Sequence, residues 1–546
     1  MRGLPAARAG RSPVTDAASV GTGERERRKL VARAGVVAAG TLASRVLGLV
    51  REVALAAMFD REATDAWSVA FTIPNAMLSL LGEGAVTSAV VPVLSAKLER
   101  EGDGAARILF SRVRGVSLLA LSVMTVLGMA LARPLTHLFA AFAKPSEFER
   151  TVVLTRAVFP YIFFMGTAAL GMAALNVKRR FAVAAFAPGL LNVALLVATF
   201  ALPAALASRG IDPALALAAG ALVGGALQVA AQWPALRAIG FARAPTLVLD
   251  DDVRTILRRI GPLTLGFGVY YVDLVLSRRF LSGLGVGAQS YFWWAMRLCD
   301  FPQGIFSLAL STAALPSLSA LAAAGDRSEF AKTWAHGLGL SLFVAIPASA
   351  LFVAVGEPIV VTLFQRGELD ALAAHETARA LAWQGASVWT VAVVRQTVSA
   401  LYALGDTRTP VAVSALDLLA FIGLAVALIG RLGHVGVSVA VAGSSTVQMV
   451  LLLAGLKRRL GAVEARPLAR AAARTAASSA LAGLAGWGAA RWTTSGAAAT
   501  AAARAMPGIV GTLAFGIVFL AGAWAMRSPE LEEILGAARR RLGRTG

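Results

Sequence analysis

Residues 33–58 read RAGVVAAGTLASRVLGLVREVALAAM, and this stretch indicates the fold class. It is almost entirely apolar, and as a helix rising about 1.5 Å per residue it is long enough to cross the ~30 Å hydrocarbon core of a bilayer. Similar runs follow along nearly the whole chain, separated by charged residues or by glycine and proline. They predict an all-α integral membrane protein with fourteen transmembrane helices: 33–58, 67–95, 114–140, 152–176, 183–206, 213–239, 257–282, 288–318, 335–355, 377–403, 410–430, 434–458, 468–491 and 505–526.

The composition supports this class and excludes others. Of the 546 residues, 57% are hydrophobic and 15% are charged, whereas soluble domains carry roughly 25% charged residues. The net charge of +21 matches the Lys/Arg excess of cytoplasmic loops in membrane proteins, so we expect no nucleic-acid partner. The single cysteine, Cys299, excludes an intrachain disulfide. The four histidines are scattered without metal-ligand spacing, so neither a metal site nor a bound cofactor is predicted.

Basic residues alternate between successive predicted loops, which gives the topology. The even-numbered loops hold Lys97 and Arg100, Lys178 to Arg180, and Lys457 to Arg459, while the odd-numbered loops are poor in Lys and Arg. This bias predicts that both termini lie in the cytoplasm. Arg278 and Arg279, near the outer end of the seventh span, go against the rule.

Short motifs recur at an offset of roughly 226 residues, as expected for an internal repeat. Pro92 to Ala96 (PVLSA) corresponds to Pro316 to Ala320 (PSLSA), and Pro74 to Pro302. An offset of six spans keeps both repeats in one orientation, which is the plan of transporters whose two lobes rock around a central site. The predicted parts are a disordered cytoplasmic tail (1–32), an N-lobe (33–239), a C-lobe (240–458), a C-terminal helix pair (459–526) and a basic cytoplasmic tail (527–546).

Ionisable residues inside predicted spans mark candidate functional positions, because each costs about 2.5–3.5 kcal/mol at mid-span. In the first span Arg45 and Arg51 are about 120° apart around the helix axis, so both can border one cavity, with Glu52 beside them. The alternative is that they snorkel to the membrane surface. Arg297 either faces the same interior or pairs locally with Asp300 at i, i+3.

Three acids in the predicted spans are further candidates. Glu83 lies between two glycines, which permit close helix approach. Asp273 and Asp417 are lone acids in the seventh and eleventh spans, and we interpret them as ion or proton sites or as partners of the arginines. Arginines from two lobes facing one interior make a cationic cavity suited to phosphate. A cation path would be lined by acids instead.

Several motifs resemble the MurJ (MviN) lipid II flippase family, over roughly residues 33 to 460. They are Ser44–Glu52 (SRVLGLVRE), Thr64-Asp65-Ala66, Ile73-Pro74-Asn75, Gly82–Ala85 (GEGA), Asn192, Arg297-Leu298 with Phe301 to Gly304 (FPQG), and Tyr402 to Pro410 (YALGDTRTP). The resemblance implies fourteen helices, two six-helix lobes, and a C-terminal pair that forms a groove for a lipid tail.

The resemblance also implies roles for individual residues. Arg45, Arg51 and Arg297 match arginines thought to hold the pyrophosphate and sugars of the substrate. Asp65 matches a functionally important acid. The family position of Glu52 usually holds Asp, and Ser44, Glu83 and Asn192 join the expected substrate-binding set.

Two features depart from the family pattern. An arginine common in the second span is absent, because Leu78 and Ser79 stand there. Asp273, Asp417 and Thr446 are available for a sodium site described in some members, but Phe421 and Ala425 are apolar where ligands are expected.

The expected function is therefore transport, without enzymatic chemistry. The expected substrate is the undecaprenyl-pyrophosphate-linked glycan lipid II, flipped across the plasma (inner) membrane by a monomer in contact with membrane lipids. A membrane potential or a cation gradient is the expected energy source. The alternative is export of another polyprenyl-linked glycan or of small amphipathic compounds. The chain has no Walker A sequence, and Asp250 to Asp252 form the only acidic run, which opens a helix rather than a metal motif.

Overall fold

The computed structural model describes residues 40–78, 84–266, 268–304, 308–461, 465–494 and 500–542. Within these ranges the chain forms helices and contains no strand. The predicted N-terminal tail, Ser79 and Glu83 lie outside the described residues.

The N-terminal half begins with a helix over residues 40–58. It continues with α2 (Arg61–Leu78), α3 (Gly84–Ala130), α4 (Ala132–Phe139), α5 (Pro145–Val158), α6 (Tyr161–Val177), α7 (Phe181–Ala201), α8 (Pro203–Ala207) and α9 (Leu215–Ala238). Within α3 the backbone leaves helical geometry at Gly102, where φ is 79°. A positive φ favours glycine, and α3 is therefore two helices joined at that residue.

The C-terminal half is helical in the same way. It comprises α10 (Asp251–Gly266), α11 (Gly268–Ser282), α12 (Ala288–Pro302), α13 (Leu308–Ala323), α14 (Arg327–Phe364), α15 (Ala371–Ala386), α16 (Val388–Ala403), α17 (Arg408–Leu432) and α18 (His434–Leu460). After it come α19 (Ala465–Thr493), α20 (Ala501–Ala525) and α21 (Pro529–Leu542). The predicted basic tail thus contains a further helix.

The described helices fit a multi-pass membrane protein, and the described part of each predicted span is mainly helical. Seven of the described segments are long and apolar enough to cross a bilayer on their own: Ala89–Ala130, Pro145–Val177, Leu215–Ala238, Arg327–Phe364, Arg408–Leu432, His434–Leu460 and Ala501–Ala525. Other predicted spans are divided, as 377–403 is between α15 and α16. The count of fourteen crossings therefore stays a prediction.

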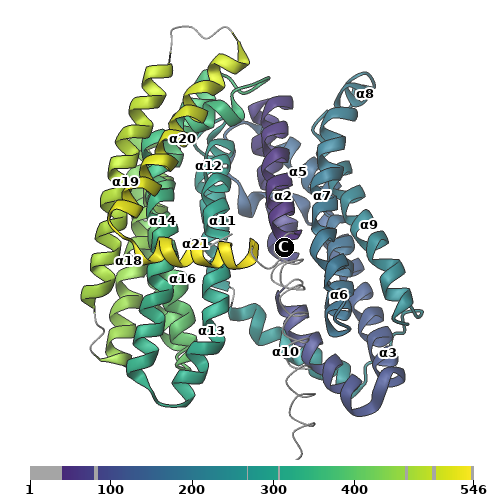
Figure 1. The fold of residues 1–546 in the computed structure, drawn as a ribbon. Helices are drawn as coiled ribbons and strands as arrows, with labels where there is room; N and C mark the ends of the chain where they lie inside the picture. Colours follow the sequence, from purple (N-terminus) through teal and green to yellow (C-terminus); the bar gives the residue numbers. More distant parts are fainter. Residues whose placement is uncertain are drawn as a thin grey trace, which may run out of the picture.

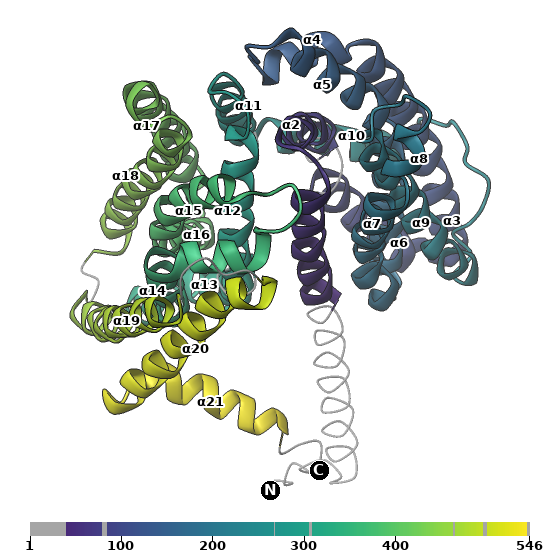
Figure 2. The same ribbon diagram turned by 90° about the horizontal axis from the view of Figure 1, so that it is seen from above.

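The helices form two groups that face each other, α2 to α9 on one side and α11 to α20 on the other (Figure 1). The helix over residues 40–58 stands between them (Figure 2). Its residues join the cores of both groups: Leu55 packs with Phe71 and Leu154, whereas Ala56 packs with Trp294. The helix is therefore the central element around which the two groups are arranged. The paired α19 and α20 pack on α14.

The topology gives a first testable prediction. A reporter fused after Gly546 is expected to report the cytoplasm, and one fused after Gly285, in the turn between α11 and α12, is expected to report the outside. The physical reason is the alternation of basic loops. Paired alkaline phosphatase and fluorescent-protein fusions measure this directly, and identical readings at both sites would refute the orientation.

Candidate functional site

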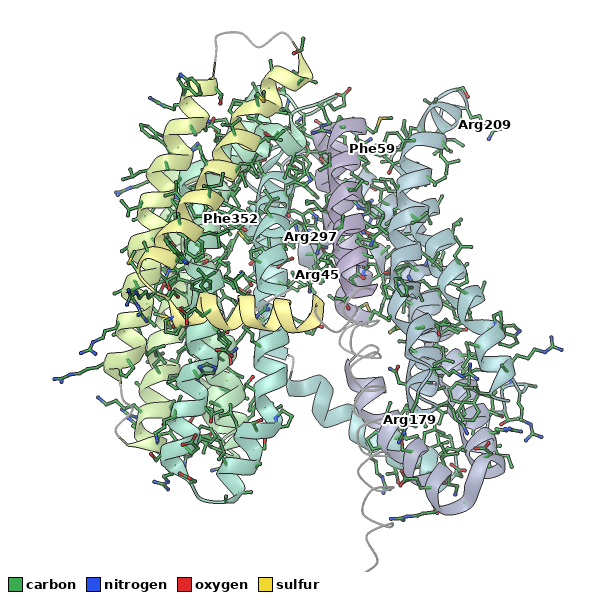
Figure 3. The ribbon with its side chains drawn as sticks, in the orientation of Figure 1. Arg45, Phe59, Arg179, Arg209, Arg297 and Phe352 are labelled. Carbon is green, nitrogen blue, oxygen red and sulfur yellow. The ribbon has the colours of Figure 1, made fainter. Side chains whose placement is uncertain are left out.

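A cavity of about 1550 Å³ lies between the two groups of helices. Its walls come from the helix over residues 40–58, α3, α6 and α7 on one side, and from α12 and α16 on the other. Among the described residues, five arginines and three carboxylates line it: Arg45, Arg51, Arg179, Arg297, Arg395, Glu52, Glu99 and Asp300. Arg45 and Arg297 lie close together between the two groups, and Arg179 lies nearer one end (Figure 3). Arginines outnumber acids, so the cavity suits an anionic ligand.

Arg51 is buried and held in place from two directions. Its Nη2 lies 2.5 Å from Glu52 Oε1, and its Nη1 donates to Asn192 Oδ1 at 2.8 Å. The Asn192 amide in turn donates to the Ser44 carbonyl at 3.0 Å. The predicted residues Ser44, Arg51, Glu52 and Asn192 therefore form one hydrogen-bonded group, and burial of Arg51 rules out the snorkelling alternative for it.

Arg297 lies on the opposite wall of the cavity and contacts the same hydrogen-bonded group. Its Nη1 lies 3.6 Å from Asp300 Oδ2, the local pair, and its Nε lies 3.9 Å from Glu52 Oε1 across the cavity. The guanidinium also stacks on the Trp293 ring at 4.2 Å, while the Trp293 indole donates to Glu52 Oε2 at 3.2 Å. Arg297 therefore lines the cavity and also lies next to Asp300, and its role in substrate binding stays a prediction. Trp293 is a site residue that the sequence reasoning missed.

Arg45 reaches the far side of the cavity as well. Its Nη1 donates to the Asp300 carbonyl at 3.2 Å. The guanidinium lies against Gly304, where an added Cβ would stand 1.9 Å from Nη1. Arg395 of α16, also missed, donates to the Gln303 carbonyl and side chain, each at 3.4 Å. The sequence contains a signal that could have identified Arg395, because it is an arginine within an apolar run.

Asp65 does not line this cavity but lies at its closed end. Its carboxylate accepts hydrogen bonds from the backbone N–H of Gly287 at 2.6 Å and of Ser290 at 2.8 Å, and from the Ser290 hydroxyl at 2.5 Å. Asp65 belongs to α2, and the donors lie at the start of α12, where free N–H groups and the helix dipole favour a negative charge. Asp65 therefore caps a helix of the opposite group.

Other contacts close the same end. Arg61 pairs with Asp370 at 3.0 Å, and the Glu368 N–H donates to the Ala57 carbonyl at 3.0 Å. Arg278 is 1% exposed and donates to Ser68 at 3.1 Å, which explains an arginine that breaks the loop-charge rule. Arg279 donates to the His137 carbonyl at 2.6 Å.

Asp273 and Asp417 are not lone acids. They lie on the packed helices α11 and α17, close enough for their charges to interact. Ser444 of α18 lies beside Asp417, whereas Thr446 is exposed and its hydroxyl donates to the Ala442 carbonyl of its own helix at 2.8 Å. Ser444, not Thr446, is the α18 residue at this place. Among the described residues no cluster of His, Cys, Asp or Glu could hold a metal ion.

These acids give a second prediction. If Asp273 or Asp417 carries a coupling cation, its replacement by Asn is expected to change the ion or voltage dependence of transport, because a neutral amide no longer attracts the ion. Transport into proteoliposomes under imposed gradients measures this, and Thr446→Ala is the matched control. If the ion and voltage dependence of transport is unchanged in both Asn variants, Asp273 and Asp417 have a structural role only.

The family commonly has an arginine near the position of Leu78. In this chain Leu78 does not face the cavity. It is 2% exposed and packs with Phe71 and Met165 in the core of the first helix group. An arginine at position 78 would therefore be buried among apolar side chains rather than join the cationic site.

Comparison with known proteins agrees with this geometry. A family model described as "Lipid II flippase MurJ" matches residues 55–504. The chain is 32% identical over 438 residues to a probable lipid II flippase MurJ of Bdellovibrio bacteriovorus, covering 79% of this chain and 83% of the relative. It is 32% identical over 430 residues to the lipid II flippase MurJ of Burkholderia cenocepacia, covering 77% and 82%.

Solved structures share the fold. A lipid II flippase MurJ in an inward closed conformation superposes with a TM-score of 0.71 at 21% identity, covering 90% of this chain and 99% of that one. An inward-facing multidrug resistance MATE family transporter gives a TM-score of 0.63 at 15% identity, covering 77% and 95%.

Proposed function

Because this chain belongs to the lipid II flippase MurJ family, we propose that it moves lipid II from the inner to the outer leaflet of the bacterial plasma membrane. The observation that carries the proposal is the cavity between the two helix groups, to which Arg45, Arg51 and Arg297 contribute from both sides. Guanidinium groups bind phosphate through paired N–H donors, and this suits the pyrophosphate of the substrate.

The mechanism is alternating access. The cavity extends to Glu99 and Arg179, at the end of the helices where the basic loops lie, while Asp65 and its partners close the other end. The headgroup enters from the cytoplasmic side and competes with Glu52, Asn192 and Asp300 for the arginines. The two groups then rock so that the Asp65 end opens, and the headgroup leaves outside.

No bond is made or broken in this cycle, so the proposal needs no catalytic residue and no bound cofactor. The chain acts as a monomer, with both termini in the cytoplasm and with membrane lipids around it. The undecaprenyl tail of the substrate stays in the lipid, along the groove formed by α19 and α20. The energy source is the membrane potential or a cation gradient, which Asp273 and Asp417 would sense.

The test is depletion of the protein in its host. Lipid-linked peptidoglycan precursor is expected to accumulate on the inner leaflet, measured by its protection from an externally added enzyme that cleaves it. Resupply of the chain should release the block. Unchanged amounts of precursor on the outer leaflet after depletion would favour the second candidate, export of another polyprenyl-linked glycan, which the same cationic cavity would serve.

A further inference from the structure

The C-terminal helix α21 is fixed to the bundle at its start. Leu531 is buried with Phe343 and Phe519 at the contact of α14 and α20. Glu533 pairs with His336 of α14, with 3.2 Å between Oε2 and Nε2. From this attachment α21 runs across the direction of α14 and α20, and it extends away from the bundle (Figures 1 and 2). The bundle therefore sets where α21 begins but covers only its first turns.

One face of α21 is apolar along its whole length. Leu531, Ile534, Leu535, Ala538 and Leu542 follow each other at three- and four-residue steps, which at about 100° per residue places them on one stripe. Leu531 sets the direction of the stripe, toward the apolar interior of the bundle. After Leu531 the stripe is exposed at Ile534 (40%) and at Leu535 (44%).

The level of α21 follows from the helix before it. α20 is an apolar helix of 25 residues, and at 1.5 Å per residue it is about 37 Å long, which is enough to cross the hydrocarbon core. A turn of three residues, Met526 to Ser528, separates it from α21. α21 therefore begins where the chain leaves the hydrocarbon core, and it runs along the membrane surface.

The charges of α21 are segregated along its length. Glu530, Glu532 and Glu533 lie near its start, next to α14, and Arg539, Arg540 and Arg541 follow in the part that extends outward. Cytoplasmic leaflets rich in anionic lipids attract arginines that lie close to the surface. An apolar stripe followed by arginines is the pattern of helices that lie in the interface plane.

We propose that α21 is an interfacial helix that inserts its apolar stripe into the inner leaflet and binds anionic phospholipid headgroups through Arg539 to Arg541. The choice of leaflet rests on the proposed cytoplasmic C-terminus. The site is separate from the substrate cavity, and it anchors the C-terminal helix pair to the membrane surface next to the proposed groove for the lipid tail.

The test compares two positions that are both exposed to solvent. Leu535→Cys and Glu532→Cys are made in the full chain with Cys299→Ser, since Cys299 is the single cysteine. Each is labelled with an environment-sensitive fluorophore in vesicles of phosphatidylcholine and phosphatidylglycerol. Iodide is expected to quench the label at 535 about fivefold less than the label at 532, and a lipid-attached quencher should show the reverse order, because only the stripe enters the leaflet.

A second experiment tests whether the arginines bind anionic lipid headgroups. Arg539→Gln with Arg541→Gln should increase iodide quenching at position 535 in vesicles that contain phosphatidylglycerol, with no change in pure phosphatidylcholine. No change in either vesicle would overturn the anionic-lipid assignment. Equal iodide quenching of the two labels would place α21 in water. Protection at 535 without quenching from the lipid would mean that a protein surface covers the stripe. None of these readouts depends on lipid II, so their failure is distinct from failure of the flippase proposal.

Discussion

Arg51→Ala is expected to abolish the ability of this chain to support growth of a host depleted of its own flippase, and Arg45→Ala and Arg297→Ala are expected to do the same. A pyrophosphate brings about two negative charges into the cavity, and each charge-assisted contact with it contributes about 1.5–3 kcal/mol. Loss of one contact therefore weakens binding by roughly tenfold or more. Lysine keeps the charge without the planar fork, so the lysine variants should retain partial function.

A double variant separates substrate binding from folding at Arg51. Its guanidinium lies 2.5 Å from Glu52, and both side chains are buried, so Arg51→Ala alone leaves a buried carboxylate without its nearest cation, at a cost of about 3–5 kcal/mol. Adding Glu52→Gln removes that charge. We expect the double variant to regain normal membrane levels but not growth. If the three single alanine variants all insert normally and still support growth, the cavity is not the pyrophosphate site and the mechanism is wrong.

The fold class and most of the cavity could be predicted because each leaves a local signal. The length of an apolar run reports a membrane helix without knowledge of its neighbours. A charge within such a run is costly wherever the helix packs, which singles out Arg45, Arg51 and Arg297. Arg395 has the same signal within the predicted span 377–403, and applying the cost argument to every arginine would have found it.

The partners of these residues could not be predicted, because they depend on how the two helix groups face each other. In lipid both faces of a span can be apolar, so periodicity does not report which face points inward. Trp293 stacks between Arg278 and Arg297, at 4.5 and 4.2 Å from the two guanidinium groups. That stack requires a particular rotation of α12 against α11. The proximity of Asp273 to Asp417 likewise requires the packing of α11 on α17.

The contact of Asp65 could not be predicted from the sequence either, because its hydrogen-bond partner Ser290 is 225 residues away in sequence. Its carboxylate accepts three hydrogen bonds from the start of α12, two from backbone N–H groups and one from a hydroxyl. Hydrogen bonds to a charged group contribute about 1.5–3 kcal/mol each. In the proposed alternating-access cycle this end of the molecule, which the proposed topology places outside, must open, and these bonds would break in every turnover. We therefore expect Asp65 to stabilise the state in which this end is closed.

Asp65→Ala is accordingly expected to shift the population toward the state open to the outside and to abolish growth support. The measurement uses Ala288→Cys with Cys299→Ser, because Ala288 is 4% exposed at the closed end. A membrane-impermeant thiol reagent added outside should modify this cysteine about tenfold faster or more in the Asp65→Ala background, since a bias of 1–3 kcal/mol changes a two-state population by about 5–150-fold. Asp60→Ala is the matched control. Asp60 is an exposed acid that caps its own helix α2 through the Ala63 N–H at 2.6 Å and pairs with Arg150 of α5 at 3.3 Å. Both partners lie in the first helix group, so we expect the contact between the two groups to survive its loss. Equal modification rates in the Asp65 and Asp60 variants would mean that the Asp65 contact does not hold the outer end closed.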